Sequence, residues 1–202
     1  NVSEFFRNPL QFEVLKSSVF PALLKENPRL SIWSAGCSFG PEPYSFAMIL
    51  DELEGIRAAN HKILATDLDQ EVLKRAMNGG PYTAEEVRGI SPERLSKYFQ
   101  KTGDRYQVKE TLRKRITFRR QNLLKDRFDR GFDLISCRNV TIYFSSETKV
   151  ELYGKFHDSL KPSGVFFIGG TEALLGAEAN GWGRYQGNFY RRVERTQERR
   201  VA

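Results

Sequence analysis

Apolar runs of strand length alternate with helical patterns in the first half of the chain. Residues 30–35 (LSIWSA) lead through a glycine-containing loop into residues 42–53, whose apolar positions fall on one face of a helix. Residues 62–66 (KILAT) form a second run, followed by a helical pattern at 69–78 that Gly79-Gly80 is placed to end. The pattern therefore predicts two consecutive strand–helix units.

The same alternation returns in the second half. Residues 132–136 (FDLIS) predict a strand, residues 145–160 a helix, and residues 165–168 another strand. Such alternation is typical of a doubly wound α/β fold, in which helices cover both faces of a mostly parallel sheet. Ligands of such folds bind at the carboxyl ends of the strands. We therefore expect the functional loops to follow Ala35, Thr66, Gln121 and Ser136.

Two segments near the ends of the chain depart from this alternation. Residues 9–25 carry apolar positions close to helical spacing but contain Pro21, which predicts one helix or two short ones. Residues 184–186 and 189–193 flank Gly187-Asn188, a two-residue hairpin signal. The hairpin predicts an antiparallel edge on the otherwise parallel sheet.

A third departure lies between residues 96 and 118, which contain a Gly-Asp turn and short alternation but no long helical stripe. We expect a small β excursion there, leading into a strand at 116–120. The 202 residues fit one compact domain. We place this domain at 1–193, with a small β subdomain at about 97–118, and interpret the polar, Arg-rich end at 194–202 as a flexible tail.

Composition places the chain among ordinary globular proteins, with 40% hydrophobic and 28% charged residues. No apolar run approaches the roughly 18 residues needed to cross a bilayer, and the first residues lack signal-peptide features. We expect no membrane insertion and a cytoplasmic location. Cys37 and Cys137 are isolated at predicted strand ends, which favours reduced, half-buried thiols. With only two histidines besides, no cluster has metal-ligand spacing, and no metal is expected.

The formal net charge of +7 favours an acidic partner. Charge alone does not choose among nucleic acid, anionic lipid and an acidic protein surface, and a solvated basic face is an equally good interpretation.

Candidate chemistry gathers around the loop after the first predicted strand. Gly36 and Gly40 allow the backbone of this loop to approach a ligand, although the full dinucleotide fingerprint is missing. Glu42 follows at the start of a helix, where an acid is favourable even without a ligand. Asp67 ends the second strand, the position at which nucleotide folds place an acid that bonds ribose hydroxyls. Because no phosphate-loop lysine is present, these residues favour a nucleoside ligand with little phosphate.

Four segments closely resemble the chemotaxis receptor methyltransferases of the CheR type: NVSEFFRN, IWSAGCSFGPEPYSFAM, ATDLDQEVLKRA and FDLISCRNVTIYF. The resemblance covers about residues 1–193. It implies a class I, Rossmann-like methyltransferase domain that binds S-adenosylmethionine, releases S-adenosylhomocysteine and forms methyl esters on receptor glutamates. Members of the family usually carry a helical domain before the first motif, and this sequence begins at that motif.

The resemblance also assigns site residues. It implies catalytic roles for Arg7 and Tyr143 at the transfer site. The cofactor-binding residues that it implies are Asn1, Ser3, Arg7, Gly36, Glu42, Asp67, Asn122, Leu123, Asn139 and Val140. Ser3 stands where threonine is usual, Pro41 where many members have a glutamate, and Thr141 where an aliphatic residue is usual.

The implied partners are methyl-accepting chemotaxis receptors, whose methylation helices are acidic. The resemblance points to the β excursion as a receptor-tethering element. Basic residues cluster around it at Lys97, Lys101, Arg105, Lys109, Arg113, Lys114 and Arg115. We expect a monomer. We also expect no nucleic-acid partner, because the N/D-P-P-Y loop of base methyltransferases is not visible. Two alternatives stay open: a methyltransferase of the same fold with another substrate, and a non-catalytic module that binds the cofactor or its product.

Overall fold

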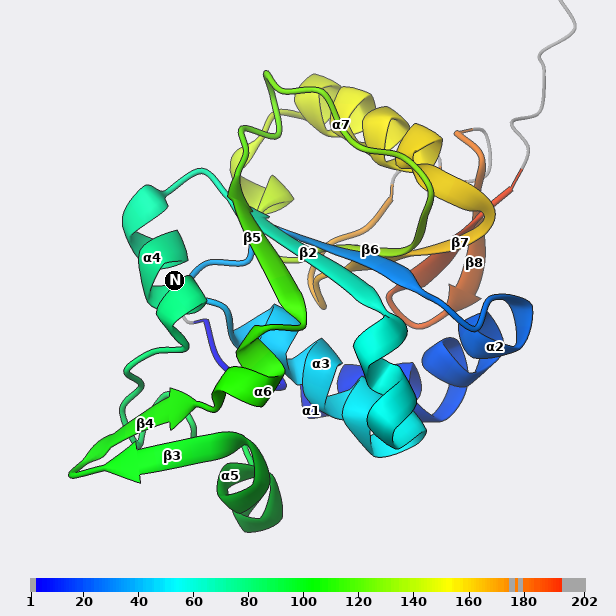
Figure 1. The fold of residues 1–202 in the computed structure, drawn as a ribbon. Helices are drawn as coiled ribbons and strands as arrows, with labels where there is room; N and C mark the ends of the chain where they lie inside the picture. Colours follow the sequence, from blue (N-terminus) through cyan, green and yellow to red (C-terminus); the bar gives the residue numbers. More distant parts are fainter. Residues whose placement is uncertain (1–2, 175–176, 178–179, 194–202) are drawn as a thin grey trace, which may run out of the picture.

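The centre of the molecule is a seven-stranded sheet of order β5-β2-β1-β6-β7-β9-β8, shown in Figure 1. The computed structural model describes residues 3–174, 177 and 180–193. The strands of the sheet are β1 (Ser31–Ala35), β2 (Lys62–Asp67), β5 (Ile116–Arg120), β6 (Phe132–Cys137), β7 (Leu160–Ile168), β8 (Trp182–Gln186) and β9 (Phe189–Arg192).

Strand directions confirm the predicted doubly wound sheet. β5, β2, β1, β6 and β7 are parallel to one another, and β9 pairs antiparallel with β7 and with the edge strand β8. The predicted hairpin is therefore β8–β9, turning at Gly187-Asn188. From β1 the chain builds outward to β2 and β5 on one side, and β6 lies on the other side of β1. This reversal leaves a crevice at the carboxyl ends of β1 and β6.

Helices cover both faces of the sheet (Figure 1). Helices α1, α2 and α3 lie on one face and α7 lies on the other. The α-helices are α1 (Pro9–Val14), α2 (Phe20–Glu26), α3 (Pro41–Glu54), α4 (Gln70–Asn78), α5 (Pro92–Tyr98), α6 (Glu110–Arg113) and α7 (Ser146–Ser159). The remaining helical segments are the π-helix η1 (Leu15–Val19) and the 3₁₀-helices η2 (Gly55–Asn60) and η3 (Thr141–Tyr143).

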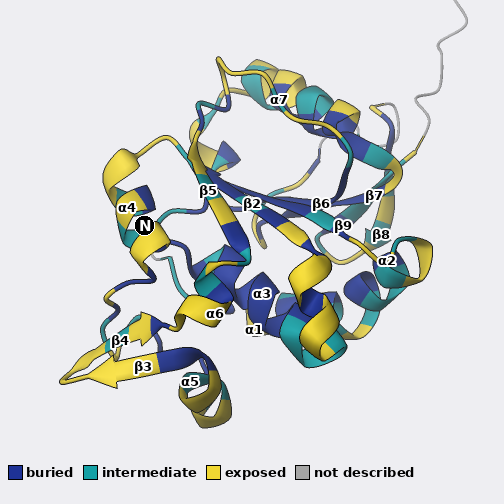
Figure 2. Ribbon diagram, viewed as in Figure 1, coloured by how far each residue is buried: buried dark blue, intermediate teal, exposed yellow. Residues whose placement is uncertain are grey.

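The sheet separates two hydrophobic cores. Ile32 of β1 packs in the core beneath α1–α3, whereas its neighbour Trp33 packs in the core beneath α7. Successive side chains of a strand point to opposite faces, so a strand covered on both sides is apolar at both its odd and its even positions. All six residues of β6 are buried, and Figure 2 shows the central strands as the buried interior.

Residues 9–26 form one continuous helical segment rather than two separate helices. The α-helix widens to the π-helix η1 immediately before Pro21, and the Phe20 N–H bonds to the carbonyl of Leu15. A regular α-helix would bring the proline ring against the carbonyl of residue 17. The π turn is the local adjustment that lets the apolar stripe continue through the proline.

Side-chain and glycine caps set the bounds of α4. The Asp69 carboxylate accepts hydrogen bonds from the N–H groups of Glu71 and Val72, at 2.8 and 3.4 Å. Gly79, at φ 73°, ends the helix in the left-handed conformation that glycine adopts without strain. The sequence prediction of this helix is confirmed at both ends.

The β excursion extends away from the sheet at the lower left of Figure 1. It contains a two-stranded antiparallel sheet, β3 (Phe99–Thr102) and β4 (Arg105–Val108), with α5 running directly into β3. Tyr106 also bridges to Tyr82, which anchors the hairpin to the loop after α4.

The two cysteines differ from the expected half-buried state. Both Cys37 and Cys137 are free thiols and are fully buried. Burial raises the pKa of each thiol well above its usual value, so both remain protonated and unreactive at neutral pH.

In the described part of the chain, no helix is long and apolar enough to cross a membrane.

Candidate active site

A cleft of about 480 Å³ opens at the carboxyl ends of the parallel strands, within the size range of small-molecule sites. Four loops form it, those after β1, β2, β5 and β6, together with the N-terminal segment that precedes α1. The lining residues are Ser3, Arg7, Gly36, Ser38, Asp67, Leu68, Asp69, Val72, Gln121, Asn122, Leu123, Leu124, Arg138, Asn139, Val140, Ile142, Tyr143 and Phe144.

The loop after β1 forms the floor of the cleft. The N–H groups of Gly36 and Cys37 both donate to the carbonyl of Thr66, at 2.8 and 2.9 Å. Gly36 has φ +80°, and a Cβ atom there would lie 2.4 Å from Cγ2 of Val140. Ser38 is also left-handed, at φ 52°. Glycine is therefore required at position 36 both for its backbone conformation and for the close approach of the loop after β6.

Asp67 ties this floor to the end of β2. Its Oδ2 accepts the Ser38 N–H at 2.8 Å, and its Oδ1 accepts the Asp69 N–H at 3.1 Å. An ionised carboxylate has about four acceptor positions, so Asp67 can still accept hydrogen bonds from the hydroxyls of a ribose.

A smaller hollow, about 40 Å³ in volume, adjoins the cleft and is lined by Glu42. Both cavities share Arg7, Gly36 and Asn139 as lining residues. The Glu42 carboxylate accepts a hydrogen bond from the Ser34 hydroxyl at 2.7 Å and pairs with Arg138 at 3.3 Å.

Arg138 joins Glu42 to the N-terminal segment. Its side chain is only 4% exposed, and its Nη2 donates to the Arg7 carbonyl at 2.7 Å and to Asn8 Oδ1 at 2.9 Å. Burial lowers the pKa of the guanidinium, and the charge of Glu42 opposes that effect. Arg138 thereby fixes the backbone of Arg7 against the cleft.

The loop after β6 is held by Glu172. Glu172 Oε2 accepts the N–H groups of Asn139, at 2.9 Å, and Gly169, at 2.7 Å, while Oε1 accepts the Thr141 hydroxyl at 2.5 Å. Asn139 adopts the left-handed conformation at φ 59°, which asparagine tolerates better than other residues with a side chain, and these bonds hold its backbone there. The buried polar residue Thr141 thus has a defined partner.

Apolar side chains border the cleft and remain accessible. The exposed fractions are 51% for Leu68, 46% for Leu124, 46% for Ile142 and 63% for Tyr143. Exposed apolar groups gathered at one cavity indicate a ligand with an apolar part. Together with Asp67, they fit a purine nucleoside, which is the larger part of S-adenosylmethionine.

The structure brings together nearly all the predicted site residues. Ser3, Arg7, Gly36, Asp67, Asn122, Leu123, Asn139, Val140 and Tyr143 line the cleft, Glu42 lines the adjoining hollow, and Asn1 lies outside the described residues. Sequence reasoning missed Ser38, Asp69, Arg138 and Glu172. Glu172 follows the end of β7 and could have been found by the rule that strand ends carry functional loops.

Strand order and site geometry define the class of protein. A doubly wound sheet with antiparallel β9 between β7 and β8, and a nucleoside-sized cleft at the strand ends, are the architecture of a class I methyltransferase domain. A family model described as "CheR methyltransferase, SAM binding domain" matches residues 1–184. The chain belongs to this family of chemotaxis methyltransferases.

Curated relatives agree with this assignment. The chain is 44% identical to the "Chemotaxis protein methyltransferase" of Listeria innocua over 94% of its length and 72% of the relative. It is 46% identical to "Chemotaxis protein methyltransferase 1" of Pseudomonas aeruginosa over 86% of its length and 66% of the relative. Among solved structures, a TehB-like SAM-dependent methyltransferase from Corynebacterium glutamicum is 16% identical, with a TM-score of 0.48, covering 92% of this chain and 94% of that one.

Proposed function

We propose that the protein transfers the methyl group of S-adenosylmethionine to glutamate carboxylates of chemotaxis receptors and forms methyl esters. The observation that carries the proposal is the composition of the cleft. The described residues that line it include two guanidinium groups, Arg7 and Arg138, and the phenol of Tyr143, but no histidine, lysine or cysteine. The two carboxylates, Asp67 and Asp69, already accept local backbone N–H groups. A nucleophile that is already ionised suits such a cleft, because it needs no strong general base.

A glutamate side chain meets this requirement at neutral pH. The cofactor supplies a methyl group bonded to a positively charged sulfur. One carboxylate oxygen of the substrate forms the new bond to that methyl carbon, the carbon–sulfur bond breaks, and its electron pair stays on sulfur. No proton is transferred, and the products are a neutral ester and a neutral thioether.

The remaining task of the protein is to position the two reactants. Arg7 lines both the cleft and the adjoining hollow, where its charge can pair with the incoming carboxylate. Tyr143, at the exposed rim, lines the approach and helps to exclude water. Asp67, Asn122 and Val140 would hold the nucleoside.

Changing Arg7 to alanine should lower the single-turnover rate of methyl transfer about 10- to 100-fold, which corresponds to the loss of one charge-assisted contact. The measurement is transfer of labelled methyl from S-adenosylmethionine to chemoreceptor-containing membranes, scored as base-labile methanol. Arg57→Ala, at an arginine that is 71% exposed on η2, is the matched control and should transfer normally.

Base-labile label with the unmodified protein supports ester formation. Base-stable label would instead indicate a different acceptor atom, and an unchanged rate for Arg7→Ala would remove Arg7 from the transfer step.

We further propose that the tip of the β3–β4 hairpin docks on an acidic surface of the receptor. Several cations of the basic cluster have structural roles: Lys109 donates to the carbonyls of Ser96 and Lys97, and Arg115 pairs with Asp51. Lys101 and Arg105 lie on the exposed strands of the hairpin. The contacts of these two residues, Lys101 over the Tyr106 ring and Arg105 with the exposed Asp104, stay within the hairpin and leave both cations accessible to a partner.

Reversing both charges, by Lys101→Glu and Arg105→Glu, should weaken receptor binding and flatten its dependence on salt, because paired surface charges are screened. Binding to receptor-containing membranes at several salt concentrations measures this. Lys25→Glu, at an exposed position near the end of α2, is the control. If the hairpin variant shows the same salt slope as that control, the hairpin is not the docking element.

A further inference from the structure

The N-terminal segment reaches the cleft through a strained backbone. Phe6 and Asn8, on either side of Arg7, both adopt left-handed conformations, at φ 52° and 62°. Such a conformation costs a bulky residue like Phe6 roughly 1 to 2 kcal/mol, whereas asparagine adopts it more readily. The direction of the Arg7 side chain therefore depends on contacts that hold its two neighbours. Arg138 holds the C-terminal side, by its bonds to Arg7 and Asn8.

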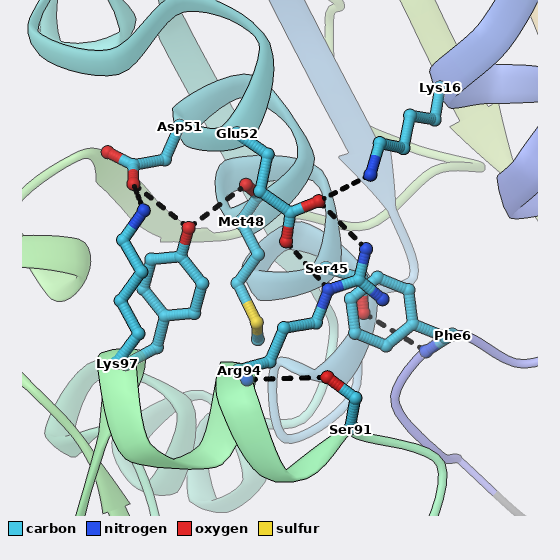
Figure 3. Close-up of polar contacts among 10 residues, drawn as sticks. Phe6, Lys16, Ser45, Met48, Asp51, Glu52, Ser91, Arg94 and Lys97 are labelled. Atoms are coloured by element: carbon cyan, nitrogen blue, oxygen red, sulfur yellow. Dashed lines mark hydrogen bonds and ion pairs between the residues drawn. The ribbon is translucent and has the colours of Figure 1, made fainter.

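Phe6 is held on the other side by three contacts. Its N–H donates to the buried Ser45 hydroxyl at 3.1 Å, and its ring meets the edge of Phe12 with centroids 5.5 Å apart. The guanidinium of Arg94 lies over the Phe6 ring, 4.1 Å from its centroid. Figure 3 shows Arg94 reaching from its helix to this ring, with Ser45 behind it.

Arg94 lies on α5, and Glu52 of α3 fixes its side chain. Its Nε and Nη2 donate to the two carboxylate oxygens of Glu52 at 2.7 and 2.9 Å, a bidentate pair that sets the orientation of the guanidinium. Lys16 adds a third bond to Glu52, at 2.8 Å. Burial raises the pKa of the Glu52 carboxyl, but the hydrogen bonds from Arg94 and Lys16 outweigh it and leave the pKa below its usual value. The Glu52 carboxylate therefore stays ionised at neutral pH. The fork, which is the bidentate pair of Arg94 with Glu52, stays intact.

We propose that Arg94 is a positioning residue for methyl transfer, which fixes Phe6 and thereby presents Arg7 at the cleft. The proposal rests on the role of Arg7 given above. Arg94 lies on α5, which continues into β3 of the hairpin. The contact therefore joins the proposed docking element physically to the transfer site, although β1, α3, β2 and α4 lie between Arg7 and Arg94 in the sequence.

Arg94→Met tests the role, because methionine keeps part of the packing and removes both the fork and the charge over the ring. We expect the single-turnover rate at saturating cofactor and receptor to fall about tenfold. The affinity for S-adenosylhomocysteine, measured by calorimetry, should change less than about threefold. Arg191→Met on β9 is the matched control: it removes a guanidinium that lies over another ring, 4.4 Å from the centroid of Tyr185, and should leave the rate within about twofold.

The decisive readout is the same change in an Arg7→Ala background. If Arg94 acts through Arg7, then Arg94→Met has almost no further effect there. A general loss of structure would reduce the rate by the same factor in both backgrounds, and that result would overturn the proposal.

Arg94→Lys guards against a poorly folding variant, because it keeps the charge and loses only the fork, and it should give an intermediate rate. A rate equal to that of the unmodified protein in both Arg94 variants would also overturn the proposal. Should Arg7→Ala itself transfer normally, the proposed role of Arg7 fails first, and Arg94 then has no residue through which to act.

Discussion

Replacing Glu42 with alanine is expected to lower the free energy of unfolding by about 3 to 5 kcal/mol and to weaken cofactor binding. The stability loss follows from Arg138, whose nearly buried charge would lose its ion-pair partner. That amount is a large fraction of the roughly 5 to 15 kcal/mol by which native domains are stable. Urea denaturation measures the first effect, and calorimetry with S-adenosylhomocysteine measures the second.

Two further variants separate these effects. Glu71, in the first turn of α4, is an exposed acid in the same helical position, and Glu71→Ala should cost only about 0.3 to 1 kcal/mol. The double change Glu42→Leu with Arg138→Met removes both charges together and should recover part of the stability, since paired apolar replacements are often tolerated. The affinity for S-adenosylhomocysteine should not recover with the stability. Equal stability losses for Glu42→Ala and Glu71→Ala would show that Glu42 is only a favourable first-turn acid.

Gly36→Ala should reduce cofactor affinity about 100-fold or more. The added Cβ would lie 2.4 Å from Val140 Cγ2, so the loops after β1 and β6 would have to separate at the floor of the cleft. The positive φ adds a backbone strain of about 1 to 2 kcal/mol. Isothermal titration with S-adenosylhomocysteine gives the affinity, and thermal unfolding gives the stability.

Gly131 provides a matched comparison, because it has nearly the same φ, +85°, but open space where a Cβ would stand. Gly131→Ala should therefore lower the thermal stability through backbone strain, without lowering the affinity for S-adenosylhomocysteine. Adding Val140→Ala to Gly36→Ala removes the clashing atom and should restore part of the binding. If the single Gly36 variant binds normally, the close approach of the two loops is not required for the site.

The fold was predictable because its main features are local in the sequence. Periodicity located the strands and the helix α4, the residues Asp69 and Gly79 marked the ends of that helix, and Gly187-Asn188 marked the hairpin. For residues 9–26 the sequence left one helix or two short ones open, since proline normally interrupts a helix, and the π turn that accommodates Pro21 leaves no simple pattern.

The site was only partly predictable from spacing. Asp67 and the glycine loop follow from their places at strand ends, whereas Arg7 and Tyr143 came from the family resemblance alone. Arg138 and Glu172 were missed because they act through contacts with residues far away in the chain, such as the bond from Arg138 to the Arg7 carbonyl. Hydrophobic patterns show which residues are buried, but not which buried charges meet.

The N-terminal segment before α1, residues 3–8, forms one wall of the cleft and is also part of the core beneath α1–α3. Phe5, Phe6 and Phe12 are all buried in that core, on the same short stretch of chain that carries Ser3 and Arg7. We therefore expect the wall and the sheet to open as one cooperative unit, so heat should not release Arg7 before it unfolds the sheet. By linkage, a ligand held against this wall adds to global stability, by about 2.7 kcal/mol at a concentration 100 times its dissociation constant.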